Sequence, residues 1–116
     1  MTIGELSQMT GISPSALRYY EKKELIRVGR DAAGRRIYDE GDVEWVKFIQ
    51  RLKDTGMQLK EIRRYSALRY QGDGTMARRL EILESHRLYV LDEQKKWDEY
   101  LDNLDKKIDY YKEHIK

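Results

Sequence analysis

The sequence has no cysteine, a single proline, and no glycine after Gly74 among its 116 residues. Without cysteine the chain cannot form a disulfide, a thiolate metal site, an iron–sulfur cluster or a cysteine nucleophile. No apolar run approaches the roughly 20 residues that a membrane-spanning helix needs, and the first ten residues lack the apolar segment of a secretory signal. We therefore expect a cytoplasmic protein with no membrane partner and a mainly α-helical fold whose last third is uninterrupted.

Net charge is also small, at +2 from 23 basic and 21 acidic side chains. Its distribution is uneven, because residues 1–38 carry seven basic and four acidic side chains, whereas residues 77–116 carry nine and ten. Positive charge in the first third is expected of a segment that meets a polyanion such as DNA.

The chain begins with a short helical pattern. Thr2 and Glu5 have the spacing of a capping box, in which each side chain bonds the backbone of the other. The apolar residues that would share one face of this helix are Ile3, Leu6 and Met9.

A tight turn and a second helix follow. Gly11 can adopt the positive φ of such a turn, Ser13 is a good N-cap, and Pro14 suits the first helical turn because its missing N–H is not needed there. Two short helices joined by a glycine turn form the helix-turn-helix pattern.

The second helix carries "LRYY" at residues 17–20. Consecutive helical residues point in different directions, so these four side chains cannot all face a core. In a helix-turn-helix the second helix enters the DNA major groove, which makes Ser15, Arg18 and Tyr19 candidate contacts. Tyr20 could bury its ring and expose its hydroxyl. The alternative is that both tyrosines are core residues and Arg18 is only solvated.

Residues 27–40 predict a two-stranded wing. Gly29 and Gly34 punctuate the segment, and Val28 could pair with Ile37 across the hairpin. The hairpin would present a second cluster of basic and tyrosine side chains, formed by Arg30, Arg35, Arg36 and Tyr38. The alternative is a solvated turn.

Two more helices are expected before a break at residues 69–74. The first begins after an Asp39 N-cap and ends at Gly56, and the second covers about residues 58–68. Their inward residues would be Val43, Val46, Ile49 and Leu52, with Trp45 and Phe48 beside them, and then Leu59, Ile62 and Tyr65.

One helix is expected from about Thr75 to the end. With Leu80 at heptad position a, the a and d positions are apolar except for Arg87 and Gln94. Such a stripe needs a partner helix, and a second copy of the chain can supply it. The predicted dimer interface contains Leu83, Val90, Trp97, Leu101, Leu104, Ile108 and Tyr111.

The series "TIGELSQMTGISPSALRYYEKKELI", the basic wing, "DVEWVKFIQRLKDTGMQLKEI" and the long helix together resemble the MerR family of bacterial transcription regulators over essentially the whole chain. The resemblance implies a winged helix-turn-helix domain over residues 1–70, a linker over 71–76 and an antiparallel coiled-coil dimerisation helix over 77–116. It implies a homodimer on a pseudo-palindromic promoter operator, where distortion of the spacer between the −35 and −10 elements lets RNA polymerase use both. The DNA-binding candidates are Thr2, Ser15, Arg18, Tyr19, Tyr20, Arg30, Arg35, Arg36 and Tyr38.

Two positions depart from the family pattern. Arg35 occupies a wing position where many members have tyrosine, so a salt bridge to phosphate could replace a tyrosine contact. Gln58 stands where the cap of the fourth helix is often serine, which predicts a weaker cap.

Effector sensing through thiolates or an iron–sulfur cluster is excluded by the lack of cysteine, and we expect a family member that lacks a large effector domain. A small effector pocket could be lined by Tyr65, Tyr70, Tyr89 and Trp97, although these residues could equally be packing and interface residues. His86 lies near acidic residues, but a single helical histidine is usually only exposed. We expect no metal, no cofactor and no enzymatic activity.

Two other functions fit parts of the pattern. An architectural DNA-binding protein of the excisionase type could share the winged head, although the long dimer helix disfavours it. A coiled-coil adaptor whose head binds protein is the second, and a gel-shift assay with the protein's own upstream DNA separates it from both DNA-binding functions.

Overall fold

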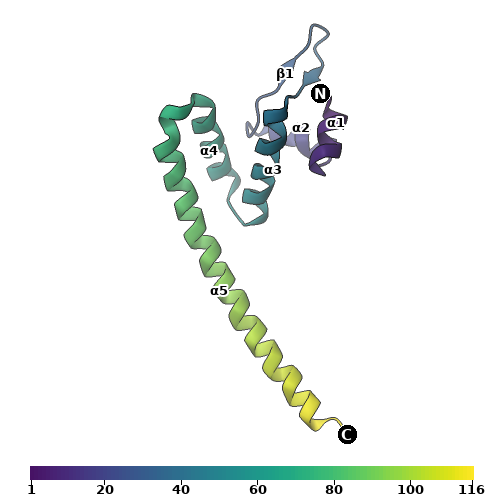
Figure 1. Ribbon diagram of the computed structural model, residues 1–116, viewed down its shortest axis with the longest axis vertical. Helices are drawn as coiled ribbons and strands as arrows, with labels where there is room; N and C mark the ends of the chain where they lie inside the picture. Colours follow the sequence, from purple (N-terminus) through teal and green to yellow (C-terminus); the bar gives the residue numbers. More distant parts are fainter. The chain divides into compact units, whose positions relative to one another are not determined.

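The computed structural model describes all 116 residues, which form two compact units, Met1–Ile82 and Leu83–Lys116. The helices are α1 (Ile3–Thr10), α2 (Pro14–Lys22), α3 (Glu40–Asp54), α4 (Leu59–Gln71), the 3-10 helix η1 (Asp73–Thr75) and α5 (Met76–His114), and the strands are β1 (Gly29–Arg30) and β2 (Arg36–Ile37) (Figure 1). The fold is therefore mainly helical with a small two-stranded wing, as predicted. None of the helices has the length and apolarity that a membrane crossing requires.

Helices α1 and α2 start and stop where local chemistry predicts. Thr2 and Glu5 form the capping box, Gly11 ends α1 with φ 74°, and the Ser13 hydroxyl accepts a hydrogen bond from the Ala16 N–H at 3.1 Å. Of the three apolar residues expected to share one face of α1, Met9 is 56% exposed. Leu6 alone supplies the fully buried contact of this short helix.

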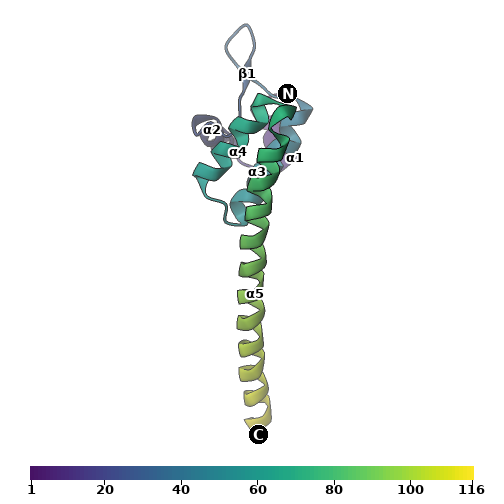
Figure 2. The same ribbon diagram turned by 90° about the vertical axis from the view of Figure 1, so that its left-hand side faces the viewer.

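The wing protrudes from the helical body of the first unit in both ribbon views (Figures 1 and 2). Gly29 pairs with Ile37 and Arg30 with Arg36, so the predicted pairing of Val28 with Ile37 is wrong by one residue. The register follows from strand alternation. Tyr38 turns into the core, and its neighbour Ile37 therefore points outward, where it is 44% exposed.

Helices α3 and α4 together supply eight of the 17 buried hydrophobic residues of this unit. The predicted inward residues of α3 are all buried, as is Trp45. The Trp45 ring stacks on Tyr65 of α4 with centroids 5.7 Å apart. Both Trp45 Nε1 and Ser66 Oγ donate to the Leu25 carbonyl, at 3.2 and 2.5 Å. These buried bonds attach the segment after α2 to both helices.

The α4 helix runs three residues beyond its predicted end. Its N-cap residue Gln58 makes no side-chain capping bond, as its departure from serine predicts. After Gly72, the buried Thr75 hydroxyl donates to the Leu68 carbonyl at 2.6 Å, and Arg79 Nε donates to Thr75 Oγ1 at 3.1 Å. The start of α5 is thereby tied to the end of α4, although the predicted division at residues 71–76 stays a prediction.

The second unit is the helical segment from Leu83 onward. It is helical to His114. The whole of α5 spans 39 residues from Met76, close to the predicted helix from about Thr75 to the end. None of its residues is buried in the single chain, since the only buried residue of α5, Ile82, lies before it. The apolar side chains of this segment that are large and exposed include Trp97, Leu101, Leu104, Ile108 and Tyr111.

Candidate nucleic-acid interface

Helix α2 divides its side chains between core and solvent. Leu17 and Tyr20 are buried to 0% and 1% exposure, whereas Arg18 and Ser15 are exposed and Tyr19 is 41% exposed. Arg18 makes no hydrogen bond or ion pair within the chain. The helix therefore presents an unpaired guanidinium next to a half-exposed phenol, which together can contact phosphates and base edges.

Tyr20 differs from the expectation that its hydroxyl points outward. The hydroxyl donates to Gln50 Oε1 of α3, and burial raises the pKa of the phenol above its usual range. Lys53 of the same helix lies 5.7 Å from the Tyr20 ring centroid. Tyr20 therefore positions α2 against α3 in this structure.

Tyr38 is likewise not presented by the wing, contrary to the prediction. It is 2% exposed, its hydroxyl has no hydrogen-bond partner, and burial raises the pKa of the phenol. Its backbone pairs with Met1, since the Tyr38 N–H donates to the Met1 carbonyl at 2.9 Å. Tyr38 thus anchors the end of the wing in the core.

The wing arginines are exposed to different degrees and held by two carboxylates. Arg35 is 80% exposed in its side chain and bonds Asp31 at 3.1 Å within the hairpin turn. Arg30 and Arg36 both bond Glu21 of α2, at 2.7 and 3.0 Å. Glu21 therefore links the wing to the helix that carries Arg18.

Sequence reasoning missed the role of Glu21. Part of its signal was available, because acidic residues inside a strongly basic stretch, here Glu21, Glu24 and Asp31, are well placed for internal ion pairs. The partners could not be named, since Arg30 and Arg36 reach Glu21 only through the fold of the hairpin. Thr2, another predicted DNA contact, is exposed and uses its hydroxyl as the α1 N-cap.

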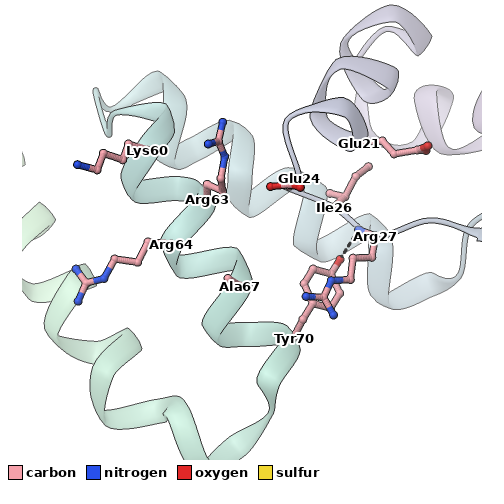
Figure 3. A pocket seen from close by; sticks show the side chains of 9 residues that line it. All are labelled: Glu21, Glu24, Ile26, Arg27, Lys60, Arg63, Arg64, Ala67 and Tyr70. Carbon is pink, nitrogen blue, oxygen red and sulfur yellow. Dashed lines mark hydrogen bonds between the residues drawn. The ribbon is translucent and has the colours of Figure 1, made fainter.

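A basic groove lies between α4 and the segment that follows α2 (Figure 3). The Tyr70 hydroxyl accepts a hydrogen bond from the Arg27 N–H at 3.0 Å, and the Arg27 guanidinium lies over the Tyr70 ring. The groove has a volume of about 590 Å³. Its lining holds four cations and two carboxylates and consists of Glu21, Glu24, Ile26, Arg27, Lys60, Arg63, Arg64, Ala67 and Tyr70.

The predicted effector-pocket residues fall into different settings. Tyr65 is buried against Trp45 and does not line the basic groove, whereas Tyr70 does. Tyr89 and Trp97 belong to the second unit and are 46% and 69% exposed. His86 stacks on Tyr89 with centroids 6.0 Å apart, and no group of three or more metal-ligating side chains occurs in the structure.

These features define a winged helix-turn-helix protein whose second helix and wing carry the exposed cations. The sequence signature described as "MerR HTH family regulatory protein" matches residues 1–68, and that described as "MerR, DNA binding" matches residues 43–107. The chain therefore belongs to the MerR family of transcription regulators, whose members are not enzymes.

Individual relatives agree with this assignment. An uncharacterized HTH-type transcriptional regulator of Haemophilus influenzae is 36% identical over 111 residues, which cover 95% of this chain and 82% of that protein. A Listeria monocytogenes protein assigned to the MerR family has a TM-score of 0.93 at 32% identity, covering 98% of this chain and 87% of that one. HiNmlR, a MerR family regulator lacking the sensor domain and solved bound to promoter DNA, has a TM-score of 0.86 at 35% identity, covering 97% and 90%.

Two other relatives are covered over a smaller part of their length. The chain spans 66% of the length of AdhR from Bacillus subtilis and 48% of the length of ZntR from Escherichia coli. AdhR and ZntR therefore contain sequence that does not align with this chain.

Proposed function

We propose that this regulator binds a pseudo-palindromic promoter operator as a homodimer, with α2 in the major groove and the wing on the flanking backbone. The main support is Arg18, which is exposed and unpaired beside Tyr19 on α2. Glu21 of the same helix joins it to the wing arginines Arg30 and Arg36. An arginine in this position can bond guanine or clamp a phosphate, and arginines on a wing supply salt-dependent affinity.

The comparison proteins support DNA as the partner. HiNmlR, whose structure matches 97% of this chain, was solved bound to promoter DNA. In this proposal Ser15, Arg18, Tyr19 and the wing residues Arg30, Arg35 and Arg36 contact the duplex. Tyr20 and Tyr38 hold α2 and the wing in place. Thr2 is exposed at the start of α1 and is available for contact with DNA.

Dimerisation follows in the proposal from the exposed stripe of the second unit. Large apolar side chains such as Trp97, Leu104 and Ile108 are 69%, 57% and 41% exposed in the single chain. Leaving this stripe in water costs about 25 cal/mol for each Å² that a partner would cover. A second copy covers it and at the same time duplicates α2, as a palindromic operator requires.

Control of transcription is proposed to work through the shape of the DNA. The dimer bends and untwists an overlong spacer, so that RNA polymerase engages both promoter elements. Distorting a site of this size costs on the order of 1–6 kcal/mol, which the wing and helix contacts must offset. A small effector that needs no thiolate ligand completes the proposal, and the cations of the basic groove favour an anionic one.

Binding to the DNA upstream of the protein's own gene tests the proposal. Arg18→Ala should weaken specific binding about tenfold or more, corresponding to about 1–3 kcal/mol, and leave the dimer intact. Arg78→Ala is the matched control, because it removes an exposed arginine from α5. Equal affinity of the Arg18 variant and the unchanged protein would refute the role of α2.

In vitro transcription tests the spacer mechanism. A promoter with a long spacer should respond to the protein, and deleting base pairs to give the ordinary spacing should remove the need for it. If both templates respond alike, the protein does not act by distorting the spacer.

A further inference from the structure

A second cavity lies at the base of the wing, next to the basic groove. Its volume is about 500 Å³, within the range of small-molecule binding sites. The wing, the start of α3 and the end of α4 all contribute to its lining. We call it the wing-base cavity. Its charged and aromatic lining includes Arg27, Arg30, Asp39, Asp42, Arg69 and Tyr70.

We propose that the wing-base cavity binds a small organic anion, a carboxylate or phosphate that also carries hydroxyl or amino groups, and that this anion loosens the wing from α2. The cavity differs from the basic groove, although Arg27 and Tyr70 line both. Binding of the anion stands on the cavity alone, whereas its effect on transcription rests on the DNA binding proposed above.

Two arginines of the cavity are held by aromatic rings. The Arg27 guanidinium lies 4.7 Å from the Tyr70 ring centroid (Figure 3), and that of Arg69 lies 4.3 Å from the centroid of Trp45 and 5.2 Å from that of Tyr70. Neither arginine side chain makes a hydrogen bond or ion pair within the chain. Stacking fixes a guanidinium and leaves its N–H donors free. These two groups are therefore already placed to bind an oxyanion.

The two carboxylates of the cavity explain why the anion should also carry donors. Asp39 accepts a hydrogen bond from the Asp42 N–H at 3.0 Å, and Asp42 accepts one from the Asp39 N–H at 2.9 Å. Each bond uses one carboxylate oxygen, so the other oxygen can accept a hydrogen bond from a ligand. A hydroxyl or amino group beside the anionic end would meet these oxygens, whereas a bare anion would only be repelled by them.

Arg30 connects the cavity to the attachment of the wing. It lines the cavity and at the same time bonds Glu21 of α2 at 2.7 Å. An anion held by Arg27 and Arg69 gives Arg30 a second acceptor that competes with Glu21. Ion pairs at such exposure are weak, so the exchange costs little. The wing would lose one of its two ion pairs to α2, and a cation would be neutralised, so operator binding should weaken.

Trp45 fluorescence can report binding, because Arg69 lies over its ring. The chain has two tryptophans, so Trp97→Phe leaves Trp45 as the only one. In this full-length background, glycerol phosphate should change the emission with saturation in the millimolar range. Inorganic phosphate should bind more weakly, and glycerol should have no effect. Sodium chloride keeps the ionic strength equal in all titrations. A signal that does not saturate, or equal signals from glycerol and glycerol phosphate, would overturn the site.

Calorimetry with single variants locates the site. Arg27→Gln and Arg69→Gln should each weaken binding of glycerol phosphate about tenfold or more. Arg64→Gln is the matched control, since it removes a cation from the basic groove but not from the wing-base cavity, and it should bind like the unchanged protein. Weakening by Arg64→Gln but not by Arg69→Gln would place the anion in the basic groove and overturn this site. If thermal unfolding shows that Arg69→Gln is not folded, the comparison of Arg27→Gln with Arg64→Gln decides.

Fluorescence anisotropy with the DNA upstream of the gene tests the effect on the wing. Saturating glycerol phosphate at constant ionic strength should lower operator affinity about fivefold or more, and Arg27→Gln should remove this effect. Unchanged operator affinity with the probe bound would overturn the coupling to the wing. If both arginine variants weaken operator binding without any added anion, the arginines bind DNA phosphates and the inference is wrong. Absence of operator binding in the unchanged protein would instead refute the proposed function, and calorimetry would still decide the site.

Discussion

The ion pairs of Glu21 give the most informative perturbation of the first unit. Glu21→Gln keeps the shape of the side chain but removes the charge that holds Arg30 at 2.7 Å and Arg36 at 3.0 Å. We expect the wing to lose its fixed position relative to α2. Both arginines also become free to meet phosphates.

The magnitude follows from the exposure of the groups. The Glu21 side chain is 23% exposed, and those of Arg30 and Arg36 are 44% and 29% exposed. Ion pairs at such sites contribute about 0.2–1 kcal/mol each. The substitution should therefore lower the free energy of unfolding by about 1 kcal/mol, measured by urea denaturation.

The effect on DNA binding should have two parts. Losing one negative charge and releasing two cations should raise affinity for unrelated DNA and steepen the dependence of log K on log salt by about 1–2. A wing without a fixed position should reduce the preference for operator over unrelated DNA. Fluorescence anisotropy with both duplexes at several salt concentrations measures both quantities.

Glu24→Gln is the matched control. Glu24 is an exposed neighbour that makes no ion pair. The variant therefore has the same change in net charge but keeps the ion pairs of Glu21 with Arg30 and Arg36. If the two variants have the same stability, salt dependence and operator preference, Glu21 does not position the wing and the reasoning fails.

Three other substitutions test the packing. Leu101→Glu should give a monomer by sedimentation, since it removes more than about 2 kcal/mol of apolar burial per chain and adds a charge to the seam; a stable dimer would contradict the predicted interface. Ser66→Ala should lower the free energy of unfolding by about 1–2 kcal/mol, because it removes one of the two donors to the buried Leu25 carbonyl. Tyr38→Phe should leave stability within about 1 kcal/mol of the unchanged protein or raise it, because its buried hydroxyl has no partner; a large loss in thermal denaturation would show that this hydroxyl is bonded in solution.

Local signals accounted for most of the fold. The caps at Thr2, Ser13 and Asp39 and the turn at Gly11 depend on neighbours within a few residues, and all four occur as predicted. The buried stripe of α3 also follows from helical periodicity. The length of α4 was underestimated because Arg69 and Gln71 continue a helix that the sequence "RYQGDG" was expected to end.

The candidate interface was only partly predictable. The outward position of Arg18 follows from the burial of Leu17, a local relation that the sequence contains. The burial of Tyr38 does not, because a two-residue strand gives too little alternation to tell which neighbour faces the core. The ion pairs of Glu21 with Arg30 and Arg36 depend on the fold of the hairpin. The neighbours of Trp97 in a dimer depend on a second chain.

Titration of the purified protein against the DNA upstream of its gene tests the central claim most directly. We expect saturation at two chains per duplex and a clear preference over a scrambled duplex. Affinity should fall as salt rises, because phosphate contacts release counterions. Binding without sequence preference, or affinity that is independent of salt, would contradict the assignment of α2 and the wing as the operator-reading surface.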